Sequence, residues 1–302
     1  MAVINIAKIF KKRLPSRHKM AVRRFTRSKW GDFINVAFLV AAGLFTMLPL
    51  IYAVCTSFKP LDELLIFPPR FFVRRPTLGN YMILPDLMSS LKVPLSRYVF
   101  NSVFISVVST FFYIIIATMA AFVMSKGKFK GRKVLFWIVQ FALMFNAYTL
   151  AIPRYLIFAK MNIIDTYWVE ILPHLASTLG VFLAKQYIDG YIPNALLEAA
   201  KIDGASHYRV FWSIVMPVIK PAWLTLIIEC FKTLWNSGSS IYIHSEELKT
   251  FNYAIQQIVS GGIARSGAGA AAIVVMMAVP IIIFVLNQSQ IIETMGSSGM
   301  KD

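Results

Sequence analysis

Residue types that commonly carry out chemistry are few in this sequence, and they are scattered. The four histidines have no Glu or Cys at metal-ligand spacing, and both cysteines, Cys55 and Cys230, lie inside apolar runs. No Gly-x-x-x-x-Gly-Lys-Ser/Thr loop, which would hold the phosphates of a nucleotide, occurs anywhere in the chain. The sequence therefore predicts no catalytic residues, no metal site, no cofactor and no enzyme activity of its own.

The ionisable residues that stand out are those inside an apolar run. Glu229 and Lys232 are three residues apart and so share one face of a helix. In a membrane span such residues are costly and face other helices or a water-filled path. Two interpretations stay open: a structural pair or partner contact, and the lining of a translocation path. The neutral hydrogen-bonding candidates for such a path are Asn146, Thr149 and Asn236.

The composition indicates that these residues are carried by membrane helices. The chain has 302 residues, of which 57% are apolar, with a mean hydropathy of +0.63 and a net charge of +17. These values together exclude an ordinary soluble domain. Lys and Arg cluster in short segments between apolar runs of roughly 20 residues, the length that crosses a bilayer core. The basic excess therefore reports topology in a lipid bilayer and does not indicate a nucleic-acid partner.

Six apolar runs are long enough to span a membrane. They predict an all-α, polytopic membrane protein with six transmembrane helices. The predicted spans are 33–55, 99–124, 134–158, 167–187, 211–235 and 269–292. The same boundaries divide the chain into three parts, which are a basic segment 1–32, a six-helix domain 33–292 and a tail 293–302.

Charge asymmetry orients these spans. Segment 1–32 holds ten basic residues and one acid, and the loop 125–133 holds five basic residues and no acid. Because basic loops stay inside, the N-terminus, this loop, segment 190–210 and the C-terminus are predicted to be cytoplasmic. The long loop between the fifth and sixth spans then faces outward.

Segment 190–210 carries the signals of a short capped helix. Asn194 is the expected N-cap, Gly204 provides a left-handed terminator, and Ser206 begins a second short helix. A helix of about two turns is marginal in water unless tertiary contacts hold it. The segment is therefore predicted to dock against another surface.

The stretch EAAKIDGASHYRVFWSIVMP, residues 198–217, resembles the cytoplasmic loop signature of bacterial ABC importer permease subunits. In that pattern Glu-Ala-Ala is followed after three residues by Gly204, and then by Ile214 and Pro217; only Met216 replaces the expected Leu. TSFKPLDELLIFPP, PTLGNY and FKTLWN resemble the carbohydrate branch of these permeases, the maltose-type, CUT1-like inner-membrane components.

The resemblance implies a type I ABC importer permease fold, with six transmembrane helices and a cytoplasmic coupling helix in the bacterial plasma (inner) membrane. It also implies an assembly, in which a second permease subunit, forming a heterodimer, completes the path. Two cytoplasmic ABC ATPase subunits supply energy, and an extracytoplasmic solute-binding protein delivers a carbohydrate substrate, which is a di- or oligosaccharide or a sugar derivative.

The resemblance also assigns residues of the loop to ATPase coupling. Glu198 would make polar contacts with the ATPase, Ala199 and Ala200 would permit close packing, and Gly204 would provide the turn. For Asp203 two interpretations stay open, which are an ion pair with a basic ATPase residue and a helix-end role.

The outward loop carries a second implied contact. A helix is predicted over residues 251–259, and the residues that follow would reach the binding protein in maltose-type relatives; a plain capping loop is the alternative. These residues are Ser260, Gly261, Gly262 and Ile263.

Three other functions remain open from the residues alone. An ion-coupled secondary carrier would have a similar hydropathy, although paired repeats with broken helices are not detected. An ABC permease for a non-sugar solute would share the loop signature. A scaffolding membrane protein would have no use for the docking loop, and dependence of transport on a partner ATPase separates these classes.

Overall fold

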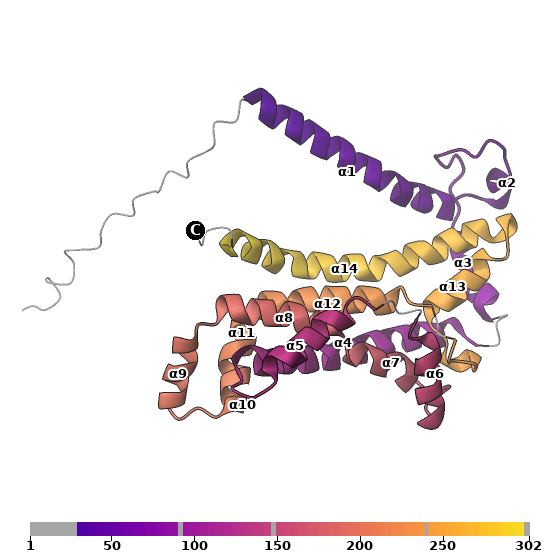
Figure 1. Cartoon of the computed structure of the whole chain (residues 1–302). Coiled ribbons are helices and arrows are strands. Elements are labelled where there is room, and N and C mark those ends of the chain that lie inside the picture. The colour runs from indigo at the N-terminus through magenta and orange to yellow at the C-terminus, as the bar shows by residue number, and fades with distance from the viewer. Residues whose placement is uncertain (1–28, 90–92, 146–148, 239–240, 299–302) are drawn as a thin grey trace, which may run out of the picture. The chain divides into compact units, whose positions relative to one another are not determined.

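The computed structural model describes residues 29–89, 93–145, 149–238 and 241–298, and every regular element in these ranges is helical (Figure 1). The chain divides into two units, 1–51 and 52–302, of which the first contains most of α1. The longer helices outside the 190–240 region are α1 (Lys29–Ser57), α3 (Gly79–Ser89), α4 (Leu95–Lys126), α5 (Arg132–Ala142), α6 (Ala151–Lys160), α7 (Trp168–Leu175), α8 (Thr178–Tyr191), α13 (Phe251–Val259) and α14 (Ser266–Ser298). The single turns outside that region are α2 (Leu61–Leu64), η3 (Glu246–Leu248) and η4 (Ile263–Arg265). The predicted all-α class is confirmed.

Three helical segments are long and apolar enough to cross a membrane. They are Trp30–Ser57, Leu95–Lys126 and Ile263–Leu286, which match the predicted first, second and sixth spans. A fourth span results if His207–Val218 and Lys220–Trp235 count as one, although they meet at an angle of 78°. Helices of this length therefore account for three of the six predicted spans, or for four if the bent pair is one span.

The predicted third and fourth spans are each built from two shorter helices. Run 134–158 is divided between α5 and α6, and run 167–187 between α7 and α8. The second break has a local cause, since the Ser177 side chain caps α8 by accepting from the Gly180 amide at 3.4 Å. An apolar run gives the length of chain within the membrane, but it does not report a cap inside that run.

The predicted fifth span is broken too. Between Ser206 and Asn236 the chain forms α10 (His207–Val210), a π-helical segment η2 (Phe211–Val215), α11 (Met216–Val218) and α12 (Lys220–Trp235). The bend falls between Pro217 and Pro221, neither of which can donate a backbone hydrogen bond. Trp223 fixes the bend, because its indole N–H donates to the Met216 carbonyl at 3.0 Å. The long straight part of this span therefore begins nine residues later than position 211.

Helix α4 is the centre of the second unit. It packs mainly on α8 and α12 and then on α7. Its buried face is rich in small hydroxyl residues such as Ser106, Ser109 and Thr118, which let neighbouring helices approach closely. The approach is tightest at Gly180 of α8, where a Cβ atom would lie 2.4 Å from the Tyr113 hydroxyl oxygen.

A second core joins α13 and α14 to α3. It includes Ile255 and Ile258 of α13 and the small residues Ala268 and Ala272 at the beginning of α14. In Figure 1 α9 (Asn194–Ile202) lies at the end of α8 and α12 that is remote from α13. The predicted docking loop and the predicted binding-protein loop therefore lie at opposite ends of the helices that connect them.

Candidate functional site: the α9 loop, the polar face of α12 and the α13 tip

Helix α9 ends in a complete Schellman motif. The Ala205 amide donates to the Ala200 carbonyl at 3.0 Å, and the Gly204 amide donates to the Lys201 carbonyl at 3.1 Å. Gly204 has φ of +76°, the left-handed conformation that this motif requires. The predicted terminator is confirmed. Among the described residues, apart from the two chain neighbours of Gly204, no heavy atom lies within 4 Å of a Cβ built at this position. Steric space is therefore available, and the positive φ is what favours glycine here.

The start of α9 differs from the prediction. Asn194 is the first helical residue, and the N-cap position is occupied by Pro193, with no capping side chain. The Asn194 carboxamide oxygen instead accepts from the Lys126 ammonium group at 3.3 Å. The next helix begins as predicted, because the Ser206 side chain accepts from the Arg209 amide at 3.3 Å.

One face of α9 is inside the protein and the other is exposed. Ala200 is only 7% exposed and belongs to the same core cluster as residues of α4 and α12, with Leu197 packed beside it. Glu198 and Ala199 are exposed, and Ile202 is 87% exposed. The two alanines therefore differ, since Ala200 allows α9 to pack on its own protein and Ala199 lies on the open surface.

The exposed carboxyl end of α9 adds an acidic residue to that surface. Asp203 follows the last helical residue, and its amide donates to the Ala199 carbonyl at 3.0 Å. Its side chain is exposed. The loop thus presents a surface of apolar, acidic and basic side chains, the last from Lys201, and the core supports it from behind.

Glu229 and Lys232 of α12 do not pair with each other in the described part of the chain. Glu229 is half-buried and accepts from the Tyr113 hydroxyl of α4 at 3.3 Å, whereas Lys232 is exposed. The two side chains share a helical face but have different neighbours. The interpretation in which they neutralise each other is therefore wrong, while a partner contact and a place on the path both remain proposals.

The two neutral path candidates among the described residues, Thr149 and Asn236, lie near the ends of helices. Thr149 is exposed in the turn before α6, and Asn146 lies outside the described residues. Asn236 caps the carboxyl end of α12 by donating to the Lys232 carbonyl at 2.8 Å, and its own carbonyl accepts from the Asn252 side chain. Asn236 thus links α12 to α13.

The turn that follows α13, residues 260–263, is exposed and is called the α13 tip. Helix α13 has the predicted bounds and buries Ile255 and Ile258. The four residues that follow it are exposed, and Gly262 has φ of +82°. They are Ser260, Gly261, Gly262 and Ile263. The turn therefore projects from a helix that is itself held firmly.

Two polar contacts that the sequence reading missed hold the outward loop. Buried Asn101 donates from its side chain to the carbonyls of Glu247 and Lys249 at 2.7 and 2.8 Å, and accepts from the Tyr167 hydroxyl at 2.7 Å. The Asp165 carboxylate accepts from the amides of His244 and Ser245 at 2.9 and 2.8 Å. The position of Asn101, a polar residue inside the apolar run 99–124, could have indicated its contact with the loop.

The hydrogen-bond donors around Asp165 determine the direction in which its pKa is shifted. The hydroxyl and amide of Ser245 hold the pKa of Asp165 below its ordinary value. Asp165 has φ of +60°, a conformation that Asp and Asn tolerate better than other non-glycine residues. The local backbone conformation therefore places the Asp165 carboxylate where it accepts from the amides of His244 and Ser245.

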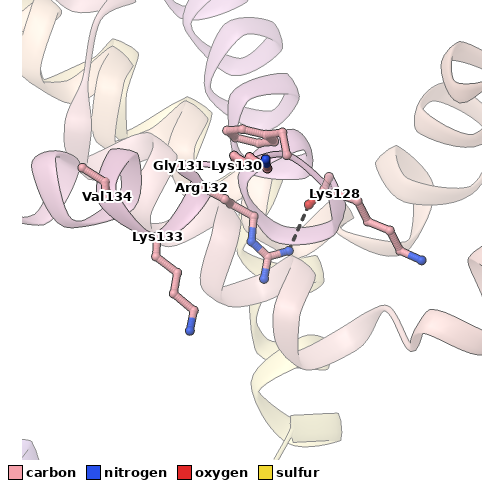
Figure 2. Close-up of a pocket in the computed structure, with 8 residues that line it drawn as sticks. Lys128, Lys130, Gly131, Arg132, Lys133 and Val134 are labelled. Atoms are coloured by element: carbon pink, nitrogen blue, oxygen red, sulfur yellow. Dashed lines mark hydrogen bonds between the residues drawn. The ribbon is translucent and has the colours of Figure 1, made fainter.

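The basic loop between α4 and α5 surrounds an open pocket of about 620 Å³, lined by residues 127–134 (Figure 2). Arg132 turns back toward the loop and donates to the Gly127 carbonyl at 3.1 Å, while Lys133 points away from it (Figure 2). Lys128 and Lys130 are exposed. The loop is thus a folded basic turn that is fastened to the end of α4.

Comparison with known proteins identifies the family. The model of the family described as "Binding-protein-dependent transport system inner membrane component" matches residues 114–294. This chain belongs to that family. Protein LplC of Bacillus subtilis (strain 168) is 30% identical over 237 residues, which cover 75% of each chain. The polygalacturonan/rhamnogalacturonan transport system permease protein YtcP of the same strain is 25% identical over 268 residues, covering 83% of this chain and 91% of that relative.

A solved structure shares the fold. A chain of a bacterial ABC transporter involved in the import of the acidic polysaccharide alginate superposes with a TM-score of 0.73 at 21% identity, covering 87% of this chain and 98% of that one. The protein is a multi-pass inner-membrane permease of a binding-protein-dependent ABC importer, and such a permease is a non-catalytic subunit. The family match includes α9, α12 and the α13 tip.

Proposed function

We propose that this permease imports a carbohydrate, which is a di- or oligosaccharide or a sugar derivative, in an ATP-driven cycle. Domain 33–292 forms half of the path and a second, different permease subunit forms the other half. Two cytoplasmic ATPase subunits hydrolyse ATP, and an extracytoplasmic binding protein delivers the solute. Segment 1–32, the α9 loop and the tail 293–302 face the cytoplasm, as the basic loops favour.

The exposed surface of α9 is the observation that carries this proposal. A helix of nine residues is too short to persist alone, yet α9 is capped at its carboxyl end and packed from behind by Ala200. Its other face has no cover within the described chain. Glu198 and Asp203 supply polar contacts to the ATPase, Ala199 allows its close approach, and Gly204 sets the direction in which the chain leaves.

The carbohydrate class is supported by the relatives and by the chemistry of the path candidates. The names of YtcP and of the alginate transporter both refer to polysaccharides. Sugars are recognised by neutral donors and acceptors, which Thr149, Asn236 and Asn146 provide. Glu229 and Lys232 line the path or contact the partner permease.

The binding-protein contact is assigned to the tip formed by Ser260, Gly261, Gly262 and Ile263. The tip is exposed, and it is anchored by α13, whose inner face is buried against α14 and α3. A projecting turn on a rigid base is suited to entering the cleft of another protein.

Purification of the tagged chain from native membranes in mild detergent tests the proposal. The wild type is expected to bring an ABC ATPase with it, and Gly204→Asp is expected to lose the ATPase. Gly190→Asp is the matched control, because Gly190 also has open space around its Cβ but lies in α8. If no ATPase accompanies the wild type even after crosslinking, the ATP-driven assembly is wrong. Equal recovery with Gly204→Asp would remove the role of the loop.

A further inference from the structure

The carboxyl end of α4 is bonded directly to the turn that joins α8 to α9. Lys126 is the last residue of α4, and its ammonium group donates to the Ile192 carbonyl at 2.6 Å and to the Asn194 side chain at 3.3 Å. Ile192 follows α8, and Asn194 begins α9. One lysine therefore contacts both sides of the turn.

Ser125, the residue before Lys126, makes a second bond, which joins α4 to α8. The Ser125 hydroxyl donates to one oxygen of the Asp189 carboxylate, and the other oxygen pairs with Lys185 of α8. The Lys185 ammonium also lies 4.1 Å from the ring centroid of Phe136 in α5. Helices α4, α5 and α8 are thus joined close to the place where α9 begins.

The position from which Lys126 reaches is itself fixed. Arg132 donates to the carbonyls of Ser125 and Gly127 at 2.9 and 3.1 Å, and so holds the residues on either side of Lys126. Figure 2 shows the second of these bonds. Gly127 packs against α4 so closely that a Cβ atom would lie 2.4 Å from the Val123 carbonyl oxygen. The lysine side chain therefore extends from a rigid base.

Such a contact is needed because the covalent link between α8 and α9 is short but not stiff. Only Ile192 and Pro193 separate the two helices, and proline fixes one of the intervening torsions while others remain free. A covalent link at a single point acts as a hinge. It keeps the ends of α8 and α9 together but does not fix the angle between the two helices. A second attachment on the far side of the turn converts the hinge into a rigid corner.

We propose that Lys126 is a positioning residue for energy coupling, which fixes α9 to α4 so that movement of α9 drives α4 directly as well as through α8. This proposal rests on the docking role assigned to α9 above. Helix α4 has the most extensive contacts in the second unit, including those with α8 and α12. A displacement delivered to its carboxyl end therefore reaches the helices that carry the path candidates.

The test uses the assembled transporter in liposomes, with its ATPase and binding protein, and measures solute transported per ATP hydrolysed. Lys126→Met keeps the length of the side chain and removes its donors. The expected result is an about tenfold lower transport-to-hydrolysis ratio, with the ATPase still bound to the permease. Lys126→Arg, which keeps a cationic donor, is expected to recover part of the ratio. Lys128→Met is the matched control, because Lys128 is an exposed lysine of the same loop.

Two outcomes would overturn this role. One is a wild-type ratio in Lys126→Met, and the other is a loss of transport that merely follows the amount of assembled complex while the ratio stays unchanged. Asn194→Ala removes one acceptor without altering α4, and it is expected to lower the ratio less than Lys126→Met. Absence of an ATPase from the wild-type complex would instead refute the proposed function, so the two failures are distinguishable.

Discussion

The two ends of α4 are both fastened to neighbouring segments by polar contacts, but the contacts differ in kind. At the amino end, Tyr98, Asn101 and Ser102 are buried, and Asn101 and Ser102 bond to backbone groups of the segment that leads into α13. At the carboxyl end, Ser125 and Lys126 bond to the α8–α9 corner, where Asp189 and Asn194 are accessible to solvent. The bonds of Asn101 and Ser102 are buried and join neutral groups, although nearby Tyr98 donates to the Glu246 carboxylate. The bonds of Ser125 and Lys126 each involve a charged group and a partner that is open to solvent.

This difference indicates what each end is able to do. A buried polar group that loses its partner has no water to replace it, so the contacts of Asn101 act as a permanent attachment. A solvent-accessible charged pair exchanges its partner for water at little net cost. The amino end of α4 therefore contributes more to the stability of the fold, whereas the contacts at the carboxyl end set the angle of the α8–α9 corner and contribute less to stability.

Asn101→Ala provides the strongest test of the comparison. The substitution removes the partner of the Lys249 carbonyl and of the Tyr167 hydroxyl, while the Glu247 carbonyl keeps its bond from Arg97. The expected loss is about 3 kcal/mol of stability, measured as a lower Tm of the purified complex. Ser125→Ala is the counterpart at the other end, where Asp189 keeps its pairing with Lys185, and less than about 1 kcal/mol should be lost. Equal losses in the two variants would refute the distinction between the ends.

Substitutions of the glycines on either side of α9 should have smaller effects, which differ in sign between Gly190 and Gly204. Gly204 and Gly190 both have open space where a Cβ would be added, but Gly204 alone of the two has a positive φ. Gly204→Ala should cost about 1 kcal/mol and weaken ATPase binding, because alanine resists the left-handed conformation. Gly190→Ala lies within α8 and should be neutral or slightly stabilising. Thermal unfolding of the two variants decides this, and a matching loss in Gly190→Ala would show that side-chain bulk, and not φ, is what matters.

The sequence predicted features whose cause is local or depends only on length. Gly204, Ser206 and the helix 251–259 follow from short-range capping and turn rules, and three membrane helices follow from apolar run length. The N-cap at Asn194 was wrong because a distant lysine, Lys126, uses its side chain. Breaks inside the third, fourth and fifth spans were missed because hydropathy averages over a window and does not register one cap or bend.

The polar contacts of the site were the least predictable part. A structural pair was one of the two interpretations left open for Glu229 and Lys232, and it rested on their spacing alone. The spacing could not show that Tyr113 of α4 would be the neighbour of Glu229. Asn101 and Asp165 likewise find their partners between 66 and 148 residues away in the sequence. Such pairings depend on how helices are placed beside one another, which one unaligned sequence does not specify.

Asp165→Asn tests whether the strength of a contact depends on where it lies in the protein or on its charge and solvent exposure. The Asp165 carboxylate holds the loop at residues 244–245, which leads to the segment bonded by Asn101, but it is charged and solvent-accessible like the Lys126 contact. Asparagine keeps the tolerance for positive φ and removes the charge. If the character of the contact decides its strength, Tm at pH 7 should fall by only about 1 °C. A fall as large as that of Asn101→Ala would show that location decides instead.

The Tm difference between the wild type and Asp165→Asn should depend on pH, and the direction of this dependence follows from the pKa of Asp165. Bonds from Ser245 lower the pKa of Asp165 in the folded protein, so the folded state binds this proton less readily than the unfolded state, where Asp titrates near about 3.9. The stabilisation is therefore complete above that value and is lost as the pH falls through the folded pKa. The wild type and Asp165→Asn should differ in Tm at pH 6 and converge as the pH falls through the folded pKa of Asp165. Ser245→Ala, which removes the hydroxyl donor and keeps the carboxylate, should show a weaker form of the same trend. A Tm difference that is constant with pH would mean that the backbone geometry at Asp165, and not its charge, holds the loop.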